Sequence, residues 1–114
     1  MTKLGDCYQV AGSLVAFDPE YADSVLCHGE VWHDEVGWHG HAWVERTLKL
    51  DHPDFGAFEV VECVDRSNGH DASVPMALYY KIGRVRHVAR YDREVVLTLA
   101  TGSRHWGPWE AETS

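Results

Sequence analysis

The sequence is short of cysteine and has no long hydrophobic run, and both shortages limit what the protein can be. Its three cysteines, Cys7, Cys27 and Cys63, are too few and odd in number for a disulfide framework. None belongs to a C-x-x-C pair, so a structural zinc knuckle is not expected. No apolar stretch approaches the roughly 20 residues that span a bilayer, and residues 1–10 lack a signal-type segment. We therefore expect a cytoplasmic protein that uses no membrane and no cofactor.

Positive charge is also in short supply. The chain has 10 lysines and arginines against 18 aspartates and glutamates, a formal net charge of −8. Because an acidic surface repels phosphate backbones, nucleic acid is not an expected partner. A late group of basic residues is interpreted as solvated surface charge: Lys81, Arg84, Arg86, Arg90 and Arg93. The length of 114 residues favours a single domain, 1–114.

Local patterns predict an α+β fold. Cys7, Val10, Ala11 and Leu14 follow helical spacing behind a good N-cap residue, Asp6. Alternating and β-branched segments predict strands over 24–33, 41–50, 57–65 and 85–91. Further helices are expected over 74–82 and 92–102. Loops are expected over 34–40, 51–56 and 66–73. The expected architecture is thus an N-terminal helix packed on a small antiparallel sheet, with C-terminal helices. The aromatic tail after residue 102 is expected to pack back on the body.

Cys7 is the first candidate for chemistry, because it opens the predicted N-terminal helix. Unpaired backbone N–H groups and the helix dipole favour an anion at that position, so a thiolate would be stabilised there. The alternative interpretation is a small buried apolar residue, which is the usual role of a free cysteine.

A thiol nucleophile needs a base and a group that orients the base. His41 opens the strand "HAWVE", and histidine can accept and return a proton near neutral pH. Asp65 ends the next predicted strand, "VVECVD", and is the natural residue to orient the imidazole. Glu45 and Glu62 are alternatives for that third role.

These strings resemble a known family. "GHAWVE" is similar to the histidine motif of the transglutaminase-like branch of the papain-like cysteine enzymes, including the leader peptidases of lasso-peptide clusters. "VVECVD" is similar to the strand that ends in the family's aspartate, and "GDCYQVAG" weakly resembles the cysteine segment of the NlpC/P60 relatives. "RHWGPW" and "RYDREVV" resemble segments of small phage and bacterial proteins that share these elements.

The resemblance covers roughly residues 5–66 and implies a papain-like core. It implies Cys7 as the nucleophile, His41 as the general base and Asp65 as the orienting group, acting on a peptide or protein substrate. The expected reaction is acyl transfer through a thioester, either hydrolysis of an amide or transfer to an amine. No Asn or Gln precedes Cys7, so the oxyanion hole would use the backbone N–H of Cys7 and a second donor such as Gln9. Tyr8 and Trp43 would help to shape the site.

Two other classes of function stay open at this level. His28, His39 and His41 could converge on a catalytic zinc ion, although no H-E-x-x-H signature is present. The chain could instead be a non-catalytic binding or inhibitory module on the same fold. The aromatic residues that would then form a contact surface are Trp32, Trp38, Trp106 and Trp109.

Overall fold

The computed structural model describes residues 6–69 and 71–109, which form an α+β arrangement of three helices and a five-stranded antiparallel sheet. In chain order the elements are α1 (Cys7–Phe17), β1 (Val25–His33), β2 (Gly37–His52), β3 (Gly56–Asp65), β4 (Ala72–Pro75), α2 (Met76–Gly83), β5 (Arg86–Asp92) and α3 (Arg93–Ser103). Short 3-10 turns lie at Pro19–Tyr21 (η1) and Ser67–Gly69 (η2). The strand order in the sheet is β4-β3-β2-β1-β5.

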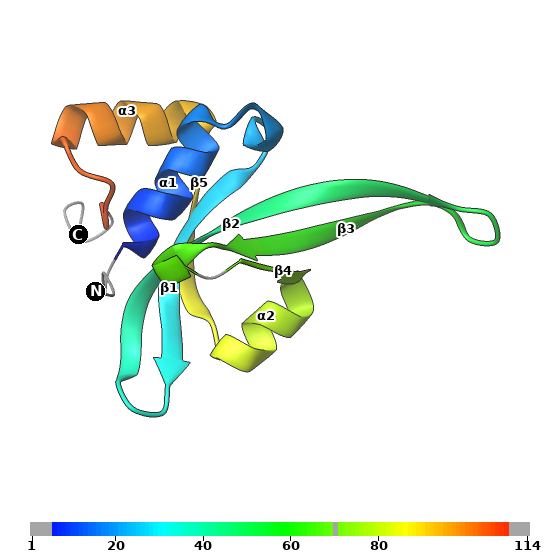
Figure 1. Ribbon diagram of the computed structural model, residues 1–114, viewed down its shortest axis with the longest axis horizontal. Helices are drawn as coiled ribbons and strands as arrows, with labels where there is room; N and C mark the ends of the chain where they lie inside the picture. Colours follow the sequence, from blue (N-terminus) through cyan, green and yellow to red (C-terminus); the bar gives the residue numbers. More distant parts are fainter. Residues whose placement is uncertain (1–5, 70, 110–114) are drawn as a thin grey trace.

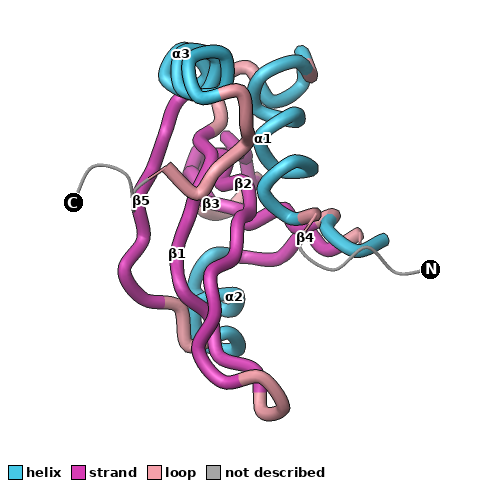
Figure 2. Tube along the Cα trace, turned by 90° about the vertical axis from the view of Figure 1, so that its left-hand side faces the viewer, coloured by secondary structure: helices cyan, strands magenta, loops and turns pink. Residues whose placement is uncertain are grey.

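The helices cover both faces of the sheet (Figures 1 and 2). α1 and α3 pack on the face that carries Leu26, Val44 and Val64, and together they bury one apolar cluster. α2 packs on the opposite face, which carries the second cluster around Cys27, Trp43 and Cys63. Because neighbouring residues of a strand point to opposite faces, the register decides which core each side chain enters.

The two halves of β2 pair with different strands. Residues 37–45 pair with β1, whereas residues 44–52 pair with β3. The far part of the β2–β3 hairpin therefore extends from the body as a two-stranded ribbon (Figure 1). Leu50, Phe55 and Phe58 are exposed on it.

The prediction of a loop over 34–40 is wrong for residues 37–40. β2 already begins at Gly37, which adopts a positive φ of 83°, a conformation that glycine adopts without steric cost. Trp38 then stands across from Trp32, and their rings meet edge to face at 5.4 Å. Cross-strand aromatic contact stabilises this extension of the hairpin, and it could not be read from the glycine-rich composition.

Two later boundaries also need correction. The expected loop over 66–73 includes the start of β4, which completes the sheet by pairing with β3. The helix expected from residue 74 begins at Met76, because Pro75 occupies its N-cap with extended backbone.

The first helix, the remaining strands and the last helix lie within one or two residues of the predicted bounds, apart from β2, which continues to His52. The tail prediction is confirmed as far as Trp109, which is buried in the first cluster, while residues 110–114 lie outside the described residues. In the part of the chain that the structure describes, no helix has the length and apolar character to cross a membrane.

Candidate functional site

The end of the β2–β3 ladder places Cys7, His41 and Asp65 close together. The last pair of that ladder is Val44 with Val64. Asp65 therefore lies where β3 separates from β2 while it is still paired with β4, on the face that His41 occupies. The chain then turns through η2, which contacts α1. The start of α1 can therefore reach the part of β2 that β3 no longer covers.

His41 and Asp65 form a close hydrogen-bonded pair. Nε2 of His41 lies 2.8 Å from Oδ2 of Asp65, and both side chains are largely shielded from water. Burial by itself lowers the pKa of His41, but the hydrogen bonds with Asp65 and with the Cys7 thiol outweigh it and raise that pKa to about 9. At neutral pH the imidazole is therefore positively charged.

Asp65 is itself held from two further sides. Its Oδ1 accepts hydrogen bonds from the backbone N–H of Ser67 at 3.1 Å and from the Ser67 hydroxyl at 2.7 Å. Its Oδ2 also accepts one from the hydroxyl of Tyr79, on α2, at 2.8 Å. Burial opposes the carboxylate charge, yet these donors and the His41 imidazole hold the pKa of Asp65 well below its usual range.

Sequence reasoning missed both Ser67 and Tyr79. The Asp-x-Ser spacing of residues 65 and 67 is typical of a local turn in which an aspartate accepts a hydrogen bond from the backbone two residues on. The contact with Ser67 could therefore have been predicted from the sequence. The contact with Tyr79 could not, because only the tertiary packing of α2 brings its hydroxyl to Asp65.

Cys7 is the first residue of α1 and is almost completely buried, with 4% of its surface exposed. Its thiol lies close enough to the imidazole of His41 to contribute to the raised pKa of that histidine. Because Nε2 of His41 is engaged by Asp65, the nitrogen left for the thiol is Nδ1. The sulfur, the imidazole and the carboxylate thus form a connected series, at a helix start where backbone N–H groups favour negative charge.

The alternatives for the third group are occupied elsewhere. Glu45 is buried and accepts hydrogen bonds from Trp43, Tyr80 and Arg90. Glu62 pairs with Arg46 at 2.9 Å. Neither carboxylate contacts His41 in these bonds, which leaves Asp65 in the orienting position.

The three residues expected to shape the site take different positions. Trp43 is fully buried and stacks behind His41, with ring centroids 6.1 Å apart and planes 25° apart. Tyr8 is half-buried, lies edge-on to His28 at 4.8 Å, and burial raises its pKa to about 12. Gln9 is exposed in the first turn of α1. Trp43 therefore supports the imidazole from inside, whereas Gln9 is open to the surface.

The three histidines proposed for zinc do not converge, so that alternative is wrong in its geometry. His39 and His41 share a face, with ring centroids 6.3 Å apart. His28 stands across from Ala42 and points to the other face, where Tyr91 and Trp109 surround it. Within residues 6–69 and 71–109, no group of three His, Cys, Asp or Glu side chains is arranged to hold a metal ion.

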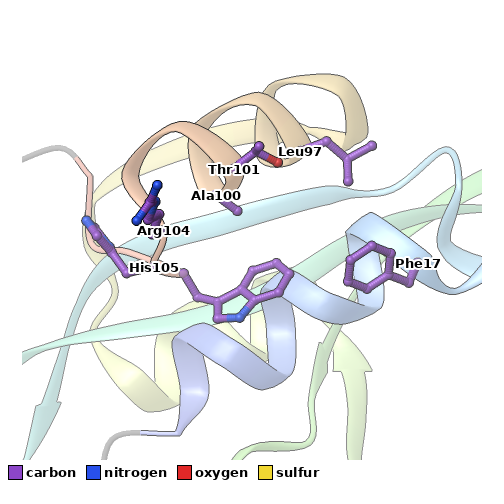
Figure 3. Close-up of a pocket in the computed structure, with 7 residues that line it drawn as sticks. Phe17, Leu97, Ala100, Thr101, Arg104 and His105 are labelled. Carbon is purple, nitrogen blue, oxygen red and sulfur yellow. The ribbon is translucent and has the colours of Figure 1, made fainter.

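A hollow of about 400 Å³ lies beside this site, between the sheet and α2, and we refer to it as the α2 pocket. His41 and Asp65 are among its lining residues. Its other polar lining residues are His33, His39, Ser67 and Tyr79, and its apolar lining residues are Val31, Trp32, Ala72, Val74 and Ile82. A second hollow, of about 260 Å³, lies between α1 and α3, where Phe17, Leu97 and Trp106 line it (Figure 3). This second hollow lies on the opposite face of the sheet, so of the two it is the α2 pocket that borders His41 and Asp65.

No protein-family model, curated protein or solved structure matches this chain. The function of this chain is therefore inferred from the geometry of Cys7, His41 and Asp65.

Proposed function

We propose that this protein is a cysteine-dependent acyl-transfer enzyme that hydrolyses a peptide or amide bond through a thioester. The observation that carries the proposal is the series from Cys7 through His41 to Asp65, with its 2.8 Å His41–Asp65 contact. Packing a cysteine in a core does not require a neighbouring imidazole that is hydrogen-bonded to a carboxylate. That arrangement is the one that nucleophilic catalysis requires.

Each residue has a distinct role in the proposed reaction. The positive His41 imidazole stabilises the Cys7 thiolate, which attacks the substrate carbonyl carbon and forms a tetrahedral intermediate. His41 then gives its proton to the departing amine, the C–N bond breaks, and an acyl-thioester on Cys7 remains. Water then attacks the thioester carbonyl and gives a proton to His41, the C–S bond breaks, the carboxylic acid leaves, and the Cys7 thiolate beside the positive His41 is restored.

The oxyanion of the intermediate needs donors near the sulfur. The first N–H groups of an α-helix have no acceptor within the helix, so the backbone N–H of Cys7 is suited to this role. The side chain of Gln9, exposed in the same turn, is our candidate for a second donor.

We also propose that the fold is a variant of the papain-like, transglutaminase-like core. Its support is the order of the elements: a helix that begins with cysteine, followed by adjacent antiparallel strands that carry histidine and aspartate. β4 and α2 extend this core, and α2 adds Tyr79 to the polar site.

The first test is the alkylation of Cys7 by iodoacetamide, followed by mass spectrometry of the three cysteine peptides across pH 5–9. Cys27 and Cys63 are internal controls, because both are fully buried and burial beside Glu45 raises the pKa of each thiol, that of Cys63 to about 12. We expect Cys7 to react at least about tenfold faster at pH 6, and His41→Ala to remove the difference. Equal rates for the three cysteines would contradict the proposed nucleophile.

A second candidate function is a protein-binding module, and the β2–β3 ribbon favours it. Leu48, Leu50, Phe58 and Val60 alternate along paired positions of the ribbon and so share one apolar face. Exposed apolar surface of this kind marks interaction sites. A Phe58→Ser variant that loses a biological effect while Cys7 keeps its reactivity would favour binding over catalysis.

A further inference from the structure

The α2 pocket borders the imidazole of the site but not its sulfur. His41 and Asp65 are among its lining residues, whereas Cys7 is not. In acyl transfer through a thioester, the groups attached to the acyl carbon lie next to the nucleophile. The groups attached to the departing or attacking amine lie next to the histidine that exchanges a proton with it. The position of the pocket thus assigns it to the amine side of the reaction.

The chemistry of the wall indicates what fits there. Val31 and Trp32 come from β1, Val74 from β4 and Ile82 from α2, so three separate elements contribute apolar surface to one hollow. A volume of about 400 Å³ accommodates a single large side chain, since binding pockets for small molecules begin at roughly 300 Å³. His41, which would exchange a proton with the amine nitrogen, lines the same hollow.

We infer that the α2 pocket binds the apolar side chain of the amine partner, so that the enzyme cleaves before, or transfers to, a residue such as leucine or phenylalanine. This inference rests on the proposed function. Burying a side chain of this size is worth about 10- to 100-fold in rate or affinity relative to glycine.

Aminolysis of a fixed acyl group tests the inference directly. The protein is first acylated with p-nitrophenyl acetate, which leaves an acetyl thioester on Cys7 and releases p-nitrophenolate. An amino-acid amide then attacks the thioester carbonyl, a C–N bond forms, the C–S bond breaks, and His41 takes the amine proton and returns it to the sulfur. Leucinamide, phenylalaninamide and glycinamide are compared by the rate at which the acetyl-protein disappears and the acetylated amide appears.

We expect leucinamide and phenylalaninamide to react at least about tenfold faster than glycinamide and to saturate. Ile82→Asp should reduce that preference to within about twofold, and Leu78→Asp should retain it. Both residues are aliphatic and exposed on α2, at 72% and 45%, but only Ile82 lines the pocket. Both variants are therefore expected to fold.

The outcomes separate the two proposals. If Cys7 forms no acetyl thioester, the proposed function itself fails. If the thioester forms but the three amides react equally fast, or if Leu78→Asp and Ile82→Asp change the preference alike, only the assignment of the pocket is overturned.

Discussion

His28 on β1 and His41 on β2 lie one pairing position apart, since His28 stands across from Ala42 and His41 across from Gly29. The two side chains point to opposite faces of the sheet. His41 meets Asp65 and Cys7, and its pKa is raised to about 9. His28 is 4% exposed, and neither of its ring nitrogens has a hydrogen-bond partner among the residues that the structure describes. Burial lowers its pKa to about 4.

The difference shows that burial alone does not decide whether a histidine is charged. His28 is enclosed by the aromatic rings of Tyr8, Tyr91 and Trp109. These rings exclude water but carry no negative charge that would stabilise a protonated imidazole. Such surroundings favour the neutral imidazole, whereas a carboxylate within hydrogen-bond distance favours the charged one. The two histidines therefore compare an imidazole packed among aromatic rings with one hydrogen-bonded to a carboxylate.

Replacing His41 should have a greater consequence than any other substitution that tests this comparison. His41→Ala should slow acylation of Cys7 by p-nitrophenyl acetate on the order of 10²- to 10⁴-fold, because the thiolate loses its counter-charge. His28→Leu should stay within about threefold, since no ring nitrogen of His28 touches the site. Stopped-flow detection of p-nitrophenolate measures both rates. A comparable loss in the two variants would show that both act through folding.

The pH dependence of acylation gives the second effect. The rate should fall as the pH rises through about 9, where His41 loses its proton. Asp65→Asn removes the carboxylate that raises the pKa of His41, so the alkaline fall should begin at a lower pH. Rate profiles of the two proteins between pH 5 and 10 measure this shift. An unchanged alkaline fall in Asp65→Asn would mean that another group sets it.

The third effect concerns stability in acid. The unfolded chain binds a proton on His28 below about pH 6.5, but the folded protein does not until about pH 4, so the free energy of unfolding should fall across this window. The loss from His28 is on the order of 2–3 kcal/mol. The raised pKa of His41 and the lowered pKa of Asp65 contribute stability that is fully present between pH 4 and 6.5, so neither disturbs the measurement.

Urea unfolding at pH 4.5 and pH 6.5 measures this third effect. His28→Leu should flatten the change in unfolding free energy, whereas His33→Ala, at an exposed end of the same strand, should leave it intact. An equally steep loss in His28→Leu would assign the acid sensitivity to other groups.

Replacing Tyr79 should change the polar site the least of these substitutions. Tyr79→Phe removes one hydrogen bond to Asp65, which is worth about 1 kcal/mol or roughly fivefold in acylation. Because the carboxylate stays charged and Oδ2 no longer accepts from Tyr79, its bond with His41 strengthens, and the alkaline fall should move to a slightly higher pH. Tyr80→Phe is the matched control, since its hydroxyl contacts Glu45 instead. A rate loss without any change of the pH profile would indicate a purely structural role for Tyr79.

The sequence by itself determined the local elements and the identity of the three candidate residues. The 3.6-residue spacing after Asp6 predicted the helix that begins at Cys7, and alternation predicted the strands that carry His41 and Asp65. These features depend on neighbours along the chain, so they can be read from it. The catalytic roles of Cys7, His41 and Asp65 stay predictions that the experiments above address.

Only the tertiary structure decided which of these residues meet. His28 and His41 look alike in the sequence, and the register between β1 and β2 alone turns them to opposite faces. The early end of the β2–β3 ladder opens the place where α1 meets His41, and the packing of α2 brings Tyr79 to Asp65. Contacts of this kind join residues far apart in the chain, and their free energy comes from burial and pairing across elements. No local pattern records them.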